Sequence, residues 1–347
     1  DETDFCAQVI QNAHKQGIPY SDWALLYRTN SQSLNFETEF LHRKIPYVIV
    51  GSLKFYDREE IKDALAYLAI TANPKDEISF RRVVNKPSRG IGDKTQDKIV
   101  IDSRNFAKDS LLGESNLLES CRRIAKDSTK KAKEGLTTFV STMDTLIKLI
   151  DQGQKAAQPL PVEQLAQQAT NNPEISTKTN ATSNTNNALP DEAPKKLSYL
   201  IEQLTLLSGL EEYHRGQDEI SGTQRVANLQ ELANSAALYP LSRDGLLDFL
   251  DHIELDKSLD SRDQEETDAV TLITIHNTKG LEFPRVLMTG LETGIFPRSD
   301  KQETELEEER RLFYVGVTRA KDQLIITSCK KRFRFGKTDE MYPSIFL

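Results

Sequence analysis

Two kinds of hydrophobic pattern divide the chain, and both of its ends carry the kind expected of an α/β domain. Short runs of β-branched and other apolar residues predict strands at 23–27, 47–50, 269–276, 285–291 and 323–329. Apolar residues at helical spacing predict helices at 3–16, 31–44, 58–71 and 304–319. Strands that alternate with helices favour a largely parallel sheet with both faces covered.

The middle of the chain, roughly residues 76–264, has no convincing strand pattern and is predicted to be helical. We therefore expect residues 1–75 and 265–347 to build one α/β domain, interrupted by a mainly α-helical inserted subdomain at 76–264. Within it, residues 152–197 hold no aromatic side chain. Such a segment buries too little apolar surface to offset its ordering entropy. A disordered loop is expected there, and an inert spacer is favoured over a tether for a partner.

The most informative local pattern lies at residues 307–320, where three glutamates and two arginines precede an apolar stretch that ends at Thr318, Arg319 and Ala320. Residues 304–307 have the form of a capping box. Helical spacing predicts a helix that carries Arg319 at its far end, on the apolar side. A guanidinium held there can bind a phosphate. A solvated charged helix that ends in an ordinary surface arginine fits the spacing equally well.

A second pattern lies about 30 residues upstream. The β-branched run 269–276 breaks into a glycine-containing loop that carries His276, Lys279 and Glu282, and a second apolar run follows from residue 285. This order is typical of a ligand-facing loop on an α/β sheet. A plain loop between strands is the alternative.

Together, residues 275–286 (IHNTKGLEFPRV) and 307–320 (EEERRLFYVGVTRA) closely resemble motifs V and VI of the UvrD/Rep-type superfamily 1 DNA helicases. Three further segments agree with that family in order, at 24–33, 46–63 and 85–92. The resemblance implies a RecA-like motor lobe interrupted by a helical subdomain. It covers both ends of the chain and leaves the middle poorly covered.

The sequence lacks two elements that such a motor needs. No Gly-x-x-x-x-Gly-Lys-Ser/Thr segment occurs to bind phosphates, and no Asp-Glu pair follows a strand to hold magnesium. The chain also opens within a predicted helix and without Met. We therefore expect the C-terminal half of a helicase, whose ATP and Mg²⁺ are bound mainly by an N-terminal lobe outside this sequence. Alone, it is not expected to hydrolyse ATP.

Composition narrows the class of protein further. Three cysteines (Cys6, Cys121 and Cys329) are far apart and in no metal-ligand spacing, which favours a reducing, cytoplasmic setting without a metal site. No signal peptide and no apolar run of membrane length occur. The net charge of the whole chain, −8, argues against nucleic-acid binding. Its distribution is uneven, however, because residues 81–98 hold six basic residues and two acidic ones. A basic face on an acidic body is compatible with DNA binding, and solvated surface charge explains it about as well.

The family resemblance implies roles at the nucleotide. Arg319 would reach across the cleft between the two motor lobes to the γ-phosphate of ATP, as an arginine finger. Glu282 would contact the nucleotide sugar, with pairing to a nearby base as its alternative. Gly280 would permit a tight turn and close approach of a ligand. We expect Arg319, Glu282 and His276 to share one rim of the domain.

The resemblance also implies contacts with single-stranded DNA, from His276 and Thr278 in the loop and from Arg28 and Asn30 after the first strand. Lys62 is a weaker candidate of the same kind. Thr278 stands where the family has Ala or Ser; its hydroxyl keeps a donor, but local packing is in doubt. A structural histidine and a strand-ending arginine paired with an acid are the alternatives.

A duplex contact is expected at residues 89–95. Gly90 and Gly92 flank an apolar residue, and Asp93 with Gln96 could cap a helix. Such a turn presents backbone amides to a phosphate and resembles a helix-hairpin-helix contact, which reads the DNA backbone. A plain turn is the alternative; the candidate contacts of this segment are Arg89, Gly90, Gly92, Lys94 and Thr95.

The sequence therefore predicts part of an ATP-dependent 3′-to-5′ DNA helicase that acts in repair or replication, travel direction and pathway being implied by the resemblance alone. Its expected partners are single-stranded and duplex DNA, the N-terminal lobe and repair or replication proteins, without a membrane. The alternatives are the helicase subunit of a helicase–nuclease complex and a DNA-binding regulatory module without motor function.

Overall fold

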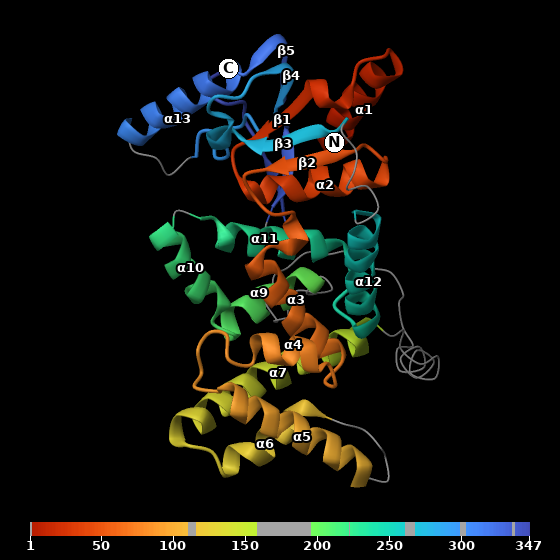
Figure 1. Cartoon of the computed structure of the whole chain (residues 1–347), viewed down its shortest axis with the longest axis vertical. Coiled ribbons are helices and arrows are strands. Elements are labelled where there is room, and N and C mark those ends of the chain that lie inside the picture. The colour runs from red at the N-terminus through yellow and green to blue at the C-terminus, as the bar shows by residue number, and fades with distance from the viewer. Residues whose placement is uncertain are drawn as a thin grey trace, which may run out of the picture.

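A computed structural model of the chain describes residues 2–109, 116–157, 196–221, 223–260, 268–298, 303–334 and 337–347. An α/β lobe, built from both ends of the chain, lies at one end of its long axis (Figure 1). A stack of helices from the middle of the chain, which we call the helical body, extends from the lobe to the other end. This arrangement agrees with the predicted interruption of one α/β domain by a helical subdomain.

Five parallel strands form the sheet of the lobe, in the order β2-β3-β1-β4-β5. Their bounds are β1 Trp23–Tyr27, β2 Tyr47–Val50, β3 Val270–Thr274, β4 Phe283–Met288 and β5 Ala320–Ile326. The predicted parallel sheet is therefore confirmed. Because β3 pairs with both β1 and β2, a strand from late in the sequence separates two strands from early in it.

Helices cover both faces of this sheet, as predicted. The side chains of Trp23, Leu25 and Tyr27 pack in one core, together with residues of α1 (Glu2–Lys15) and α2 (Ser33–His42). The alternate residues of β1 belong to a second core on the other face, together with α13 (Glu303–Val317). Alternation along an apolar strand thus supplies both cores.

Helix α13 lies close to the sheet because Gly316 has no side chain. A Cβ atom at Gly316 would lie 3.0 Å from the sulfur of Met288 on β4 and 3.3 Å from Cγ2 of Ile275. The last turn of α13 is therefore fixed against the segment that follows β3.

The helical body holds its own core. Its helices are α3 Glu59–Ala72, α4 Glu77–Val83, α5 Asp93–Asp109, α6 Leu117–Lys126, α7 Lys130–Ala157, α9 Leu197–Leu207, α10 Leu210–Ser221, α11 Arg225–Ser235 and α12 Arg243–Asp260. Helix α3, which we expected within the lobe's first segment 1–75, contributes Ile61 through Ala72 to the core of the helical body. Helix α3 therefore packs against the inserted helices and belongs to the helical body.

The lobe and the helical body meet around Arg58, whose side chain is 6% exposed. Its guanidinium donates to the Asn30 carbonyl at 2.9 Å and the Ser33 hydroxyl at 2.9 Å in the lobe. It also donates to Oδ1 of Asn228 on α11 at 3.2 Å. Asn228 in turn donates to Glu60 at 2.6 Å. One buried network therefore connects the two parts.

Two further comparisons with the sequence concern segment ends. An antiparallel pair of strands, β6 (Lys331–Arg334) and β7 (Lys337–Glu340), follows β5 and was not predicted. The predicted disordered loop at 152–197 lies, from residue 158 to residue 195, outside the described residues. The six residues before 158 belong to α7.

Candidate functional site

Arg319 lies just beyond its helix, because α13 ends at Val317 and a turn leads from there into β5. Its Nε donates to the Val315 carbonyl at 2.9 Å, and its Nη1 donates to the Leu281 carbonyl at 2.8 Å. The side chain is half-buried. Backbone carbonyls fix a guanidinium in place but do not neutralise it. Arg319 thus remains a positioned, uncompensated cation within the described part of the chain.

The loop that meets Arg319 is a tight turn. The Leu281 amide donates to the Thr278 carbonyl at 3.0 Å, and Gly280 has a φ of +84°, a value that side-chain-bearing residues rarely adopt. Glu282 follows; its side chain is 58% exposed and lies 3.6 Å from the Lys321 ammonium. The Phe283 amide donates to the Arg319 carbonyl at 2.9 Å. The amino ends of β4 and β5 therefore bring Gly280, Glu282 and Arg319 together.

His276 lies at the opposite edge of the sheet, after the carboxyl end of β3. It is exposed, and the charges that act on its ring belong to Arg28, Glu309 and Glu308. Desolvation of the ring by the surrounding protein lowers the pKa of His276, and the positive charge of Arg28 lowers it further. The expectation that His276 shares a rim with Arg319 and Glu282 is therefore wrong, because the segment between them crosses from one edge to the other.

Arg28 is buried, with 9% of its surface exposed. Its Nε and Nη2 donate to both carboxylate oxygens of Glu309 on α13, at 2.5 to 3.2 Å. This bidentate pair joins the end of β1 to α13. The alternative that the sequence left open, a strand-ending arginine paired with an acid, is the arrangement in the structure.

The other residues expected at single-stranded DNA differ in exposure. Thr278 is fully buried, and its hydroxyl donates to the Ile275 carbonyl at 2.7 Å, so its side chain stabilises the turn. Asn30 is half-buried in a short 3-10 turn. Lys62 is 42% exposed and pairs with Asp57 at 2.8 Å. Asn30 and Lys62 therefore keep a solvent-facing side, and Thr278 does not.

At the predicted duplex contact, the Arg89 side chain points into the protein. It donates to the Ser208 carbonyl at 2.6 Å, the Lys86 carbonyl at 2.8 Å and the Tyr67 hydroxyl at 2.9 Å. The Asn85 side chain accepts from the amides of Arg89 and Ile91 at 2.8 and 3.0 Å. Arg89 thus fixes the shape of the turn from within.

The helix after this turn begins differently from the expectation. The Gly92 carbonyl accepts from the Gln96 amide at 3.1 Å, and the Gln96 side chain donates to the Ile91 carbonyl at 3.1 Å. Asp93 is therefore the first helical residue of α5 and not its cap. Gly92 and Lys94 are exposed, and Thr95 is half-buried.

Lys131 is a candidate that sequence reasoning missed. Gly90 has a φ of +74°, and a Cβ there would lie 2.8 Å from Cγ of Lys131 on α7. Lys131 is exposed and has no ion-pair partner among the described residues. Three lysines in the first four residues of α7, at the positive end of its dipole, were a signal that could have identified it.

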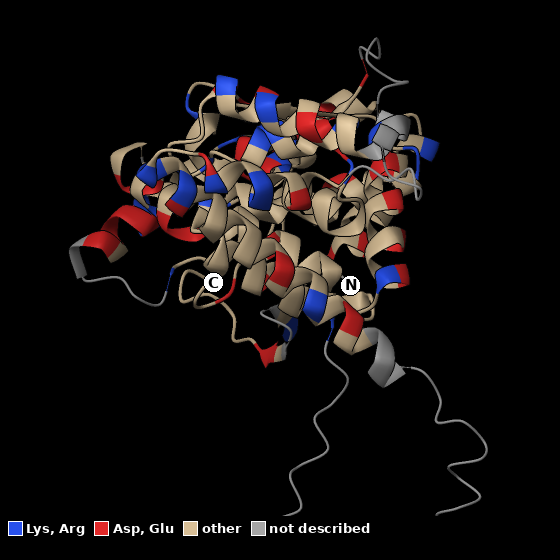
Figure 2. Cartoon of the chain, turned by 90° about the horizontal axis from the view of Figure 1, so that it is seen from below, with Lys and Arg blue, Asp and Glu red and all other residues tan. Residues whose placement is uncertain are grey.

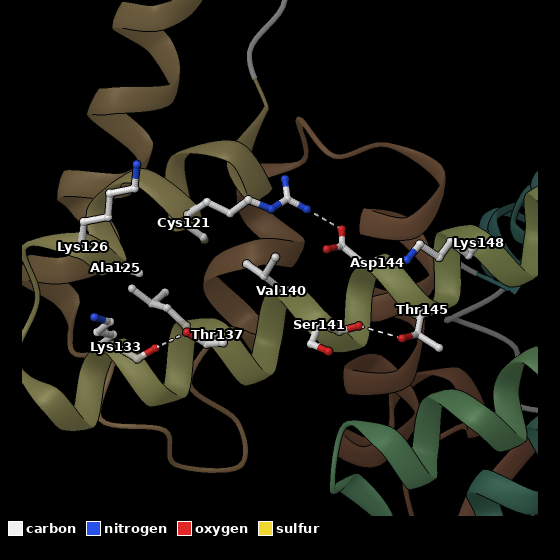
Figure 3. Close-up of a pocket in the computed structure, with 12 residues that line it drawn as sticks. Cys121, Ala125, Lys126, Lys133, Thr137, Val140, Ser141, Asp144, Thr145 and Lys148 are labelled. Atoms are coloured by element: carbon white, nitrogen blue, oxygen red, sulfur yellow. Dashed lines mark hydrogen bonds and ion pairs between the residues drawn. The ribbon is translucent and has the colours of Figure 1, made fainter.

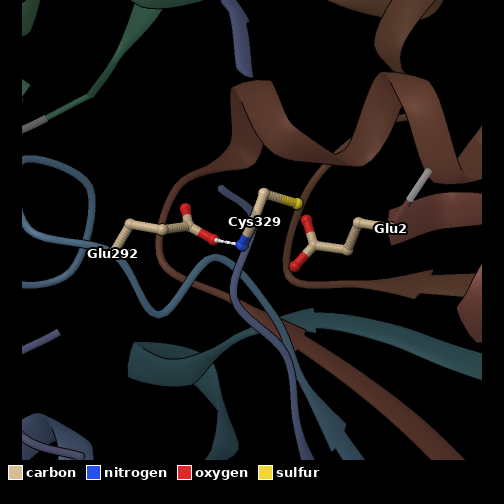
Figure 4. Close-up of side chains that lie close together, drawn as sticks. All are labelled: Glu2, Glu292 and Cys329. Atoms are coloured by element: carbon tan, nitrogen blue, oxygen red, sulfur yellow. Dashed lines mark hydrogen bonds between the residues drawn. The ribbon is translucent and has the colours of Figure 1, made fainter. Parts of the chain in front are cut away.

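Among the described residues, one group has ligand atoms close enough for a metal ion: Glu2, Glu292 and Cys329 (Figure 4). The carboxylates already have donors, however. Arg332 donates to Glu292 at 2.7 Å and also pairs with Glu2. The Cys329 amide donates to Glu292 at 2.6 Å. These contacts account for the group as a buried ion-pair cluster that joins the first helix to the C-terminal segment.

Charge and hydropathy complete the description. Positions of basic and of acidic residues are interspersed along the helices when the chain is viewed from the end of the helical body (Figure 2). No helix in the described ranges is both long enough and apolar enough to cross a bilayer.

Known proteins resemble the chain throughout its length. Residues 1–331 match the family described as the UvrD-like helicase C-terminal domain. The ATP-dependent DNA helicase PcrA of Staphylococcus epidermidis is 32% identical over 355 aligned residues, and PcrA of Staphylococcus aureus is 31% identical over 357. Each alignment covers 100% of this chain and 42% of the relative. With its parallel sheet, inserted helices and full-length match, the chain belongs to the UvrD-like helicase C-terminal domain family.

Proposed function

We propose that the chain is the second motor lobe, with its inserted helical subdomain, of an ATP-dependent DNA helicase that moves 3′ to 5′ and unwinds duplex DNA in repair or replication. Membership of the UvrD-like family and the similarity to PcrA helicases support this proposal. The chain spans 42% of the length of those relatives. In this proposal, nucleotide would be bound mainly by an N-terminal lobe.

Arg319 is the residue on which the proposal depends. It is half-exposed, positively charged and fixed by the carbonyls of Val315 and Leu281. A guanidinium held in this way pays little ordering entropy when it meets the γ-phosphate of ATP bound to the other lobe. It would stabilise the charge that develops on the transferred phosphoryl group.

Glu282 and Gly280 would complete the nucleotide edge. The Glu282 carboxylate is exposed beside Arg319 and can accept hydrogen bonds from ribose hydroxyls. The turn at Gly280 has open space where a Cβ would lie, so a ligand can approach the backbone closely. Mg²⁺ would come with the nucleotide and its own lobe, where it neutralises phosphate charge.

His276, Asn30 and Lys62 would contact the single strand along the carboxyl edge of the sheet. Arg28 and Thr278 would act there as positioning residues, because the Glu309 pair and the Ile275 carbonyl occupy their side chains. In the helical body, the backbone of Gly90 and Gly92 with Lys94, Thr95 and Lys131 would contact duplex phosphates. Arg89 would shape that turn without touching DNA.

The test is Arg319→Ala in the full-length protein. An arginine finger contributes about 10³–10⁵ to turnover, so we expect DNA-stimulated ATP hydrolysis to fall at least about a thousandfold. Affinity for single-stranded DNA should stay nearly unchanged, because Arg319 lies at the opposite edge from His276. Arg319→Lys should remain impaired, since an ammonium lacks the planar fork.

Arg215→Ala is the matched control, because Arg215 is 59% exposed in the helical body and its one ion pair among the described residues is with Glu211. Its hydrolysis rate should equal that of the unmodified protein. An Arg319→Ala enzyme that hydrolyses ATP at the normal rate would refute the finger and favour a DNA-binding module without motor function.

A further inference from the structure

A groove of about 410 Å³ lies between α6 and α7, in the part of the helical body away from the lobe (Figures 1 and 3). Its floor is apolar and consists of the buried side chains of Cys121, Ala125, Leu136 and Val140. Burial raises the pKa of the Cys121 thiol to about 12, so the floor carries no reactive thiolate near neutral pH. None of the residues proposed to contact nucleotide or DNA lines this groove.

Three lysines surround the floor: Lys126 at the end of α6, and Lys133 and Lys148 on α7 (Figure 3). All three are exposed, and none has a carboxylate partner within the described ranges. The other cation at the groove, Arg122, is compensated, because it donates to Asp144 at 2.5 Å. The groove therefore has a net positive charge in a chain whose total is −8.

The charge of the groove comes from its lysines, because the arginines beside it are compensated by carboxylates. Neighbouring arginines of α4 to α6 are each paired: Arg104 with Glu77 at 2.5 Å and Arg123 with Asp102 at 2.6 Å. Arg81 likewise pairs with Asp97, at 2.8 Å. The groove thus combines uncompensated lysines with an apolar floor.

Hydrogen-bonding capacity points to the same kind of ligand. The hydroxyls of Thr137 and Thr145 donate to the carbonyls four residues earlier, both at 2.8 Å. Their protons are used within α7, which leaves the lysine ammonium groups as the main donors. A partner rich in acceptors, and in anionic acceptors above all, complements such a groove.

We propose that the α6–α7 groove binds an acidic amphipathic helix of a partner protein. Lys133 and Lys148 are 15 residues apart on one helix, a span of about 22 Å, which matches about four helical turns of a partner. Leucine-like side chains would cover the floor, and carboxylates would meet the lysines. DNA is a poorer ligand, because phosphates would leave the apolar floor uncovered.

Binding can be measured by fluorescence anisotropy with the whole chain and a labelled 16-residue peptide that has leucine on one helical face and glutamate on the other. A peptide of the same composition in scrambled order controls for bulk charge attraction. The groove variant replaces Lys126, Lys133 and Lys148 with Glu. We expect it to weaken binding of the amphipathic peptide by at least about tenfold.

The matched charge control replaces Lys15, Lys44 and Lys330 of the lobe, also exposed, with Glu. It should bind the peptide almost as well as the unmodified chain. Ser141→Trp fills the groove from an exposed position of α7 without changing charge, and should also abolish binding. If circular dichroism shows that the Glu variant is unfolded, Gln at the same three positions replaces it.

Three outcomes would overturn the proposal: no binding of the amphipathic peptide, equal binding of the scrambled peptide, or unchanged binding by Ser141→Trp. Competition by a 20-base-pair duplex that is lost in the groove variant, without peptide binding, would assign these lysines to DNA instead. The peptide measurements require neither ATP hydrolysis nor DNA unwinding, so they are independent of the proposed helicase function.

Discussion

Replacing Arg89 with Ala distinguishes an internal role from a DNA contact. Its two terminal nitrogens carry four hydrogens, and the acceptors at 3.1 Å or less are the Tyr67 hydroxyl and the carbonyls of Val83, Lys86 and Ser208. Net contributions of about 1 kcal/mol each, with the carbonyls left without donors in the variant, give a loss of about 3–5 kcal/mol in the free energy of unfolding.

Two probes localise this loss. The chain has one tryptophan, Trp23, which is 1% exposed in the sheet of the lobe, whereas far-ultraviolet circular dichroism mainly reports the helical body. In urea, the dichroism midpoint of Arg89→Ala should fall by roughly 1–2 M. The Trp23 fluorescence midpoint should move less, since the hydrogen bonds of the Arg89 side chain to described residues all lie in the helical body.

Arg81→Ala is the control, because that side chain is 40% exposed and its one ion pair within the described ranges is with Asp97. Exposed pairs of this kind contribute about 0–1 kcal/mol. If Arg89→Ala kept its stability and lost only duplex affinity, the guanidinium would be a DNA contact and the internal role would be refuted.

Two other perturbations test the packing of the helical body. Arg58→Ala should lower the free energy of unfolding by about 3 kcal/mol or more, because it removes a buried cation that pairs with Glu37 and donates to Asn228. The fluorescence and dichroism midpoints should fall together, since Arg58 joins both parts. Separate shifts would contradict a shared network. His214 is fully buried, neither ring nitrogen has a hydrogen-bond partner in the described part of the chain, and burial lowers its pKa from 6.5. The folded state therefore disfavours the charged ring, so the urea midpoint should be constant above about pH 6.5 and fall as the pH drops below it. His214→Met should reduce that dependence, whereas a midpoint that rises on acidification would indicate a charged pair with Asp63.

Much of the fold was predictable because strands and helices are local patterns. The β-branched run at 269–274 and the apolar run at 23–27 identify strands without knowledge of their neighbours. Their bounds were less accurate where tertiary contacts decide them. A single helical turn, Ile275–Thr278, lies where the end of a strand was predicted. The Thr278 hydroxyl stabilises this turn because it donates to the Ile275 carbonyl.

The candidate site was predictable only in part, because an arginine's partner is not a local property. Arg28 pairs with Glu309, 281 positions away, and most acceptors of Arg89 are backbone carbonyls, which any residue supplies. Motifs indicated which residues matter, but not whether each would face a ligand or the interior. Lys131 was missed because its neighbour Gly90 is far away in the sequence, in the turn before α5, and only the fold brings the two residues together.

The position of β3 has a consequence for how the chain is made. On the ribosome, β1 and β2 leave the exit tunnel without the strand that must lie between them, which is 243 positions after Tyr27. At 5–20 residues per second, the nascent lobe waits about 10–50 s for it. The inserted helices are synthesised before β3, and most of their contacts join residues closer in sequence than β1 and β3, so they can fold during this time. During this time β1 and β2 expose unpaired strand edges, to which a chaperone could bind.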